Sequence, residues 1–284
     1  MPSDAPANRQ YVQNSGVQIR QIIDKVGSRL VSSHSGQALL TRVVHHLDLW
    51  RGYGAGASVA TSGEIILFKV LKELLPPTAE VIIFDVGANV GDFTALAVQY
   101  LGVHVKVHAF EPARGVFHQL AARFGTDERI TVNNIALGRE VGERPLFGTS
   151  NESGMASLLN RNLNHLGMVS SLQEVVNVCR LSDYCLASGI SKIHLLKLDV
   201  EGLELEVLSG GESLFEKKMV RMCSFEFGGC NLDSRTFLRD YFEFFDKYNL
   251  KIFRITSNGT LVSLPRYHEQ LERFVTTNYV AISE

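Results

Sequence analysis

Three carboxylates lie at or near the ends of apolar segments, where a parallel sheet would present them to a ligand. Asp199 and Glu201 close the segment 193–200, and Glu226 lies in the segment 219–227. A carboxylate in a sheet crevice can take a proton from a hydroxyl group, and burial raises its pKa toward a useful range. We predict Asp199 as the first candidate for a general base and Glu201 as the second. Glu226 would bind substrate hydroxyls or assist Asp199.

The same three acids could have structural roles instead of catalytic ones. Asp199 can cap the following helix, and Glu201 can be a first-turn carboxylate favoured by the helix dipole. Glu226 can be an inward acid satisfied by neighbouring donors. A divalent cation between Asp199 and Glu201 is another alternative, because such ions prefer oxygen ligands. The four cysteines form no Cys-x-x-Cys pair and the histidines have no zinc-finger spacing, so we assign no metal ligand.

A glycine-rich segment and an acid further along the chain form a second candidate site, of the kind that binds a nucleotide-like ligand. Asp85-Val86-Gly87-Ala88-Asn89-Val90-Gly91 follows an apolar segment and opens a helical one. Gly87 allows a sharp turn without a side chain to block a ligand, and Gly91 permits close strand–helix contact. Glu111, about 26 residues after Asp85, can accept hydrogen bonds from ribose hydroxyls. The pattern fits a nicotinamide dinucleotide or an adenosyl methyl donor, and Asn134 could face an adenine.

The hydrophobic periodicity predicts the elements that must position these residues. Strand-like and helical segments alternate, which predicts a doubly wound α/β fold with a largely parallel sheet. We expect a flexible segment 1–16, a helical extension or lid over 17–78 and a catalytic domain over 79–284. The polar segment 148–173 is interpreted as an insertion that covers a site. The expected strands are 81–86, 103–110, 130–135, 193–200, 219–227, 250–256 and 275–282.

Composition restricts the partners. The 284 residues carry a net charge of -2 and a pI of about 6.5, whereas nucleic-acid binders usually have a basic excess. The chain shows neither the apolar core of a signal peptide nor an apolar run of membrane-spanning length. We expect a soluble cytoplasmic protein that acts on a small molecule without nucleic acid. The N-terminal helices could form a homodimer.

The chain resembles the FkbM family of methyltransferases from about residue 62 to residue 282. The resemblance is carried by Asp85–Gly91, Phe110-Glu111-Pro112, Ser153-Gly154-Met155-Ala156-Ser157-Leu158 and Lys197-Leu198-Asp199-Val200-Glu201-Gly202. It implies a Rossmann-like class I methyltransferase fold with a mostly parallel seven-stranded sheet and helices on both faces. It also implies S-adenosylmethionine as cofactor and methyl transfer to oxygen, on sugars or natural-product intermediates. The candidate cofactor-binding residues are Asp85, Gly87, Asn89, Gly91, Glu111, Pro112, Asn134 and Ala136.

One departure from the family pattern concerns the mechanism. Many relatives carry a histidine just after the strand of Glu226, whereas this chain has Phe227-Gly228-Gly229. The departure weakens a mechanism that depends on that histidine or on a metal. N- or carboxyl-methylation with the same cofactor is one alternative function. A nicotinamide-dependent oxidoreductase is another, and a non-catalytic binding domain and an RNA methyltransferase are further ones.

Overall fold

The computed structural model describes residues 24, 27–28, 31–56, 62–149 and 155–283. The sequence also predicts a helix between residues 17 and 30 from apolar residues at three- and four-residue steps, and most of that helix lies outside the described residues. The chain divides into two compact units, 1–49 and 50–284. The serine-rich segment 32–36 predicts a loop between two helices, but helix α2 (His34–Trp50) begins inside it. The Gly36 amide donates to Ser33 Oγ at 3.0 Å, so the serine-rich segment starts the helix.

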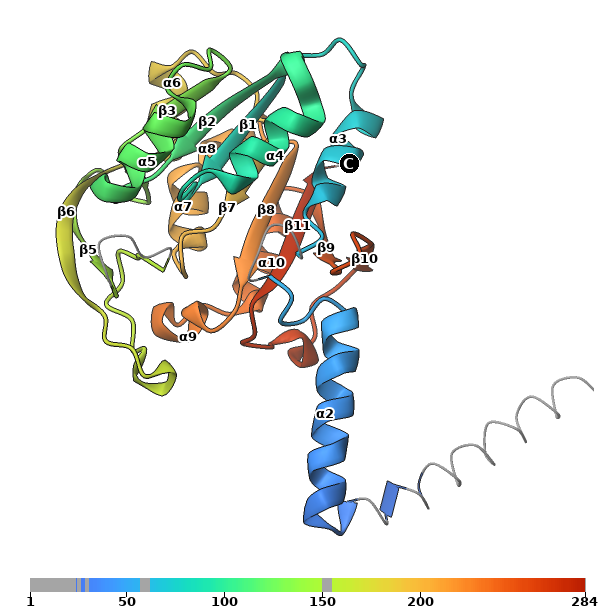
Figure 1. The fold of residues 1–284 in the computed structure, drawn as a ribbon. Helices are drawn as coiled ribbons and strands as arrows, with labels where there is room; N and C mark the ends of the chain where they lie inside the picture. Colours follow the sequence, from blue (N-terminus) through green and yellow to red (C-terminus); the bar gives the residue numbers. More distant parts are fainter. Residues whose placement is uncertain (1–23, 25–26, 29–30, 57–61, 150–154, 284) are drawn as a thin grey trace, which may run out of the picture. The chain divides into compact units, whose positions relative to one another are not determined.

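The second unit is built on a mostly parallel sheet, as predicted (Figure 1). All seven expected strands are present, but the count of seven was wrong because the sheet has eight. The added strand, β10, has four residues and pairs antiparallel with β9 across a short turn, and so short a segment carries little periodicity. The sheet order is β10-β9-β11-β8-β7-β1-β2-β3. The strands are β1 (Val81–Val86), β2 (Val105–Phe110), β3 (Ile130–Asn133), β7 (Leu195–Leu198), β8 (Met222–Phe227), β9 (Leu250–Ile255), β10 (Leu261–Leu264) and β11 (Thr277–Ser283).

Helices cover both faces of this sheet, as expected (Figure 1). One layer contains α3 (Ile65–Leu74), α4 (Asp92–Leu101) and α5 (Arg114–Phe124). The other contains α6 (Leu181–Ala187), α7 (Glu204–Gly210), α8 (Glu212–Glu216) and α10 (Leu238–Lys247). Along β1, Ile83 packs toward the first layer whereas Phe84 and Val86 pack toward the second. A strand buried on both faces reads as a continuous apolar run, which explains why the sequence identified it.

A second, three-stranded sheet was not predicted. Its order is β4-β6-β5, with β4 (Ala136–Leu137), β5 (Gly142–Gly148) and β6 (Ser171–Cys179). β5 is largely exposed and contains Pro145, so its sequence lacks the apolar run of a buried strand. β6 begins within the segment that we interpreted as a polar insertion. This sheet packs Leu146, Val176 and Val178 against Leu158 and Leu203, beside the ends of the main strands.

The sequence predicts a helix over 234–248, and the structure has one helix there, α10, which begins four residues later than expected. A short helix α9 (Cys230–Ser234) precedes α10, and the Asp240 carboxylate accepts a hydrogen bond from the Phe237 amide at 2.8 Å where α10 begins. Asp233 belongs to α9. Helix α9 follows β8 and lies next to the end of that strand (Figure 1). Among the described residues, no helix is both long and apolar enough to cross a membrane.

Candidate active site

The loops that follow β1 and β7 touch at the carboxyl edge of the sheet. Gly87 has a φ of +81°, and a Cβ there would lie 2.8 Å from the carbonyl carbon of Asp199 and closer still to its oxygen. The Gly87 and Ala88 amides donate to the Phe110 carbonyl at 3.0 and 2.9 Å, which ties the loop to the end of β2. Only glycine permits this approach, so the spacing of the two loops depends on residue 87.

A narrow pocket of about 50 Å³ opens between these loops and the second sheet. Its polar edge carries Glu111, Asn89, Asp199 and Glu201. The remaining walls are largely apolar and come from Val86, Phe110, Pro112, Ile135, Ala136, Leu137, Leu146, Ala156, Leu158, Val200 and Leu203. Gly87 and Ser157 complete the lining. Apolar walls beside a carboxylate have the chemistry to contact a flat ring attached to a hydroxylated group, although a pocket of about 50 Å³ must widen to admit one.

Glu111 is held in place by the backbone. Its Oε1 accepts a hydrogen bond from the Ala113 amide at 2.8 Å, and its Oε2 accepts one from the Asn89 amide at 3.0 Å. Burial raises the pKa of Glu111 to about 7, although both backbone bonds act in the opposite direction. Each carboxylate oxygen has a further lone pair that can accept a bond from a ligand hydroxyl.

Asp85 lies beneath the glycine loop and lines neither pocket. It is fully buried, accepts a hydrogen bond from Thr94 Oγ1 at 2.7 Å and lies 3.7 Å from Lys197 Nζ. Lys197 also donates to Asp199 at 3.0 Å and sits over the ring of Phe93. Burial raises the pKa of Asp85. Lys197 therefore links the acids that end β1 and β7, and Asp85 acts on the site through this lysine.

A larger cavity of about 790 Å³ adjoins the narrow pocket. Gly87, Asn89, Asp199 and Glu201 line both spaces, so these four residues form the passage between them. Glu226 faces the larger cavity only. Within the part of the chain that the structure describes, its side chain makes no hydrogen bond or ion pair. Burial raises the pKa of Glu226 well above its usual value, and the negative charge of Asp199 raises it further.

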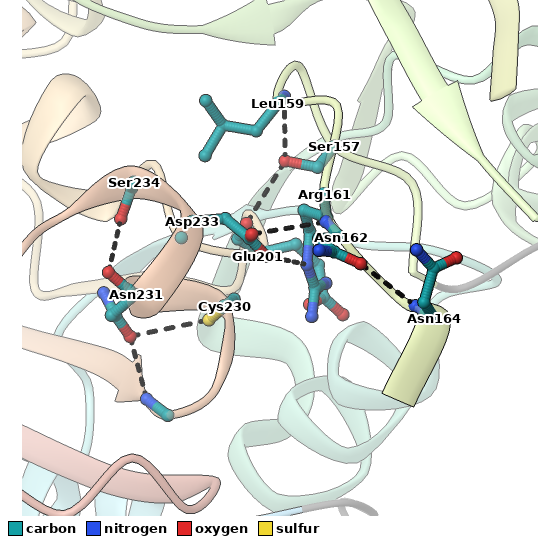
Figure 2. Close-up of polar contacts among 12 residues, drawn as sticks. Ser157, Leu159, Arg161, Asn162, Asn164, Glu201, Cys230, Asn231, Asp233 and Ser234 are labelled. Atoms are coloured by element: carbon teal, nitrogen blue, oxygen red, sulfur yellow. Dashed lines mark hydrogen bonds and ion pairs between the residues drawn. The ribbon is translucent and has the colours of Figure 1, made fainter. Parts of the chain in front are cut away.

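The carboxylate of Glu201 forms an ion pair. Arg161 binds the Glu201 carboxylate and lies 3.8 Å from Asp233, so one guanidinium bridges the loop after β7 and α9 (Figure 2). Ser157 Oγ donates to the Glu201 carbonyl at 3.1 Å, and the Asn162 amide donates to Asp233 at 3.2 Å. Burial raises the pKa of Glu201, and the positive charge of Arg161 lowers it. The described part of the predicted insertion is thus fastened over the larger cavity.

Two further expected cofactor residues, like Asp85, line neither space. The Asn134 amide nitrogen donates to the carbonyls of Glu111 and Pro112 at 3.0 and 2.9 Å, so it fixes the loop after β2. A Cβ at Gly91 would lie 2.6 Å from Leu120 Cδ1, which shows that Gly91 serves helix packing. The candidates Gly87, Asn89, Glu111, Pro112 and Ala136 line the narrow pocket.

Sequence reasoning assigned no function to Arg161, Asp233 or Glu204. Glu204 is fully buried and accepts hydrogen bonds from the amides of Val200 and Gly202 at 3.1 and 3.2 Å, which shapes the loop carrying Glu201. The position of Glu204, four residues after Val200, could have suggested this role from the sequence. No sequence pattern indicated that Arg161 and Asp233 would lie at the site. In the described residues, no three His, Cys, Asp or Glu side chains are arranged to hold a metal ion.

Comparison with known proteins agrees with the resemblance in sequence. The profile of the Methyltransferase FkbM domain matches residues 85–251. The 31-O-demethyl-FK506 methyltransferase FkbM of Streptomyces tacrolimicus is 34% identical over 157 residues, covering 46% of this chain and 59% of that protein. The 2-O-methyltransferase NoeI of Sinorhizobium fredii is 26% identical over 180 residues, covering 59% and 71%.

The match therefore spans less than two thirds of the length of the first relative. Among solved structures, an FkbM methyltransferase from Methylobacillus flagellatus has 18% identity and a TM-score of 0.43 over 74% of this chain and 45% of that one. The O-methyltransferase from Bacillus cereus in complex with SAH has 12% identity and a TM-score of 0.43 over 94% and 97%. Because the FkbM domain profile covers more than half of the residues, the chain belongs to the FkbM methyltransferase family.

Proposed function

We propose that this chain is an S-adenosylmethionine-dependent O-methyltransferase that acts on a hydroxyl group of a small molecule. The observation that carries the proposal is the passage between the two spaces. The narrow pocket, with the Glu111 carboxylate, opens past Asp199 into a cavity lined by Glu226, whose carboxylate forms no hydrogen bond or ion pair with the described residues. Two relatives whose names identify them as a demethyl-FK506 methyltransferase and a 2-O-methyltransferase support the same reaction class.

The residues of the narrow pocket fit the adenosine part of this cofactor. Glu111 would accept hydrogen bonds from the ribose hydroxyls, and the walls formed by Phe110, Ile135 and Leu158 would enclose the adenine. The absence of a side chain at Gly87 lets the loops that carry Gly87 and Asp199 approach each other at the passage to the larger cavity. When bound, the cofactor supplies a methyl group activated by its attachment to a positively charged sulfur.

The larger cavity would hold the acceptor. Its volume of about 790 Å³ is within the range of small-molecule sites, and its polar lining suits a hydroxylated compound such as a sugar or a natural-product intermediate. Asp199 and Glu201 would lie at the passage between the two spaces, next to both the acceptor and the cofactor. The paired state of Glu201 with Arg161 favours a role in orienting the acceptor over a role in proton transfer.

We assign the general base to Glu226. Asp199 was the first candidate, but its carboxylate is engaged in an ion pair with Lys197 at 3.0 Å. Glu226 has a raised pKa although the charge of Lys197 lowers it, and it forms no ion pair among the described residues. A stronger base that faces the acceptor can remove the hydroxyl proton as the oxygen attacks the methyl carbon. Asp199 would then orient the same hydroxyl group.

The test combines binding and catalysis. Calorimetry with S-adenosylhomocysteine, with NAD as control, decides the cofactor class, and binding of NAD alone would refute the proposal. With an acceptor found by screening, Glu226→Gln should lower kcat by about 100-fold or more and remove the rise of kcat with pH. The exposed Glu243→Gln is the matched control. Full activity of Glu226→Gln would favour N- or carboxyl-methylation, in which no hydroxyl proton must be removed.

The domain limits are part of the proposal. We propose 79–284 as the catalytic domain, with 17–78 as its N-terminal extension. Within the second unit, Leu67, Phe68 and Leu71 of α3 are fully buried against the main sheet, so this end of the extension would be fixed on the catalytic domain. The cytoplasmic location and the homodimer stay predictions.

A further inference from the structure

Glu64 contributes a carboxylate to the larger cavity from outside the part of the chain that matches the family profile. It lies at the start of α3, 21 residues before the match begins at residue 85. Its side chain is 4% exposed, and it lines the cavity together with Gly87, Asn89 and Phe93. A nearly buried acid beside the glycine loop is costly unless something compensates its charge.

The position of Glu64 is fixed by the preceding residues. Gly63 has a φ of +76°, and a Cβ there would lie 2.9 Å from the Gly259 nitrogen and closer still to the Thr256 oxygen. The turn is therefore pressed against the end of β9. One carboxylate oxygen, Oε2, accepts a hydrogen bond from Ser62 Oγ at 2.8 Å. Among the described residues, the other oxygen, Oε1, has no hydrogen-bond partner.

Around Glu64, the carboxylates outnumber the cationic side chains. Lys197 is the cation that acts on Glu64, and the same ammonium also serves Asp85 and Asp199. Burial raises the pKa of Glu64, Lys197 lowers it, and the charges of Asp199 and Asp85 raise it again. Three carboxylates thus depend on the charge of one lysine, and of the three only Glu64 and Asp199 line the cavity. The arrangement favours a ligand that brings a positive charge and an N–H donor.

We propose that Glu64 binds the ammonium group at the amino-acid end of the methyl donor. This rests on the proposed function, which places the ribose at Glu111. Gly87 and Asn89 line both spaces, so a ligand anchored at Glu111 runs across them into the larger cavity. Its amino-acid end then reaches the part of the wall that contains Glu64. The ammonium group donates a hydrogen bond to Oε1 and supplies the missing positive charge.

Comparing the binding of three ligands distinguishes a direct contact between Glu64 and the ammonium group from a purely structural role of Glu64. S-adenosylhomocysteine carries both charged groups, decarboxylated S-adenosylhomocysteine keeps the ammonium alone, and 5′-deoxy-5′-methylthioadenosine lacks both. Calorimetry would compare these ligands in the wild type, in Glu64→Gln and in Glu73→Gln, an exposed acid of the same helix. Glutamine keeps the size of the side chain and can still accept the bond from Ser62.

We expect Glu64→Gln to weaken both ammonium-bearing ligands by about tenfold or more, because a charge-assisted hydrogen bond is lost. Binding of methylthioadenosine should stay unchanged, and Glu73→Gln should bind all three like the wild type. An equal loss for all three ligands would show that Glu64 only supports the fold and would overturn the proposal. So would unchanged binding of the ammonium-bearing ligands. If the wild type binds none of the three, the proposed function itself fails.

Discussion

Replacement of Gly87 by alanine tests whether contact between the loops after β1 and β7 sets the geometry of the site. The new Cβ would lie 2.8 Å from the Asp199 carbonyl carbon and closer still to the oxygen. The two loops must separate, although the Asp199 amide donates to the Val86 carbonyl at 3.0 Å. Overpacking of this kind costs about 1–3 kcal/mol, and the positive φ adds about 1–2 kcal/mol for a residue with a Cβ.

The expected loss in free energy of unfolding for Gly87→Ala is therefore about 2–5 kcal/mol. Gly189→Ala is the matched control, because Gly189 also has a positive φ, +65°, but a Cβ there meets nothing within 4 Å. Its loss should be only about 1–2 kcal/mol. Urea denaturation followed by circular dichroism measures both losses, and calorimetry should show that only Gly87→Ala abolishes S-adenosylhomocysteine binding. Equal destabilisation of the two variants would refute the role of the loop contact.

Two further changes probe the buried charges. Lys197→Met removes the cation next to the fully buried Asp85, and we expect a loss of about 3–5 kcal/mol at pH 7 in urea denaturation. The loss should shrink at pH 5, because burial has raised the pKa of Asp85 and the acid can take up a proton; equal losses at both pH values would contradict this. Burial also raises the pKa of Glu204 to about 7, so the folded protein keeps a proton that the unfolded chain releases above its usual pKa of 4.5. Stability should therefore fall by up to about 3 kcal/mol as pH rises from 4.5 through 7, and Glu204→Gln should flatten this dependence; an unchanged slope would argue against the raised pKa.

Much of the main sheet could be predicted because its strands are buried on both faces. Segments such as Val81–Val86 and Met222–Phe227 are mostly apolar and bounded by turn residues, so their composition located them even though each contains an acid. The same reasoning failed for β5, whose exposed residues include no apolar run. It also failed for β10, which is too short to show a period. In both cases pairing with a neighbouring strand, which is a tertiary interaction, decides the structure.

The sequence by itself determined that a glycine loop and several acids meet at the carboxyl edge of a parallel sheet, since that follows from the order of the elements. It could not determine which acids are paired. Arg161 binds Glu201 from 40 residues away, and Lys197 joins Asp85 to Asp199. Glu64 reaches the cavity only because α3 packs on the sheet. Charge pairing depends on distances of a few ångströms, and folding alone brings residues so far apart in the chain to within that range.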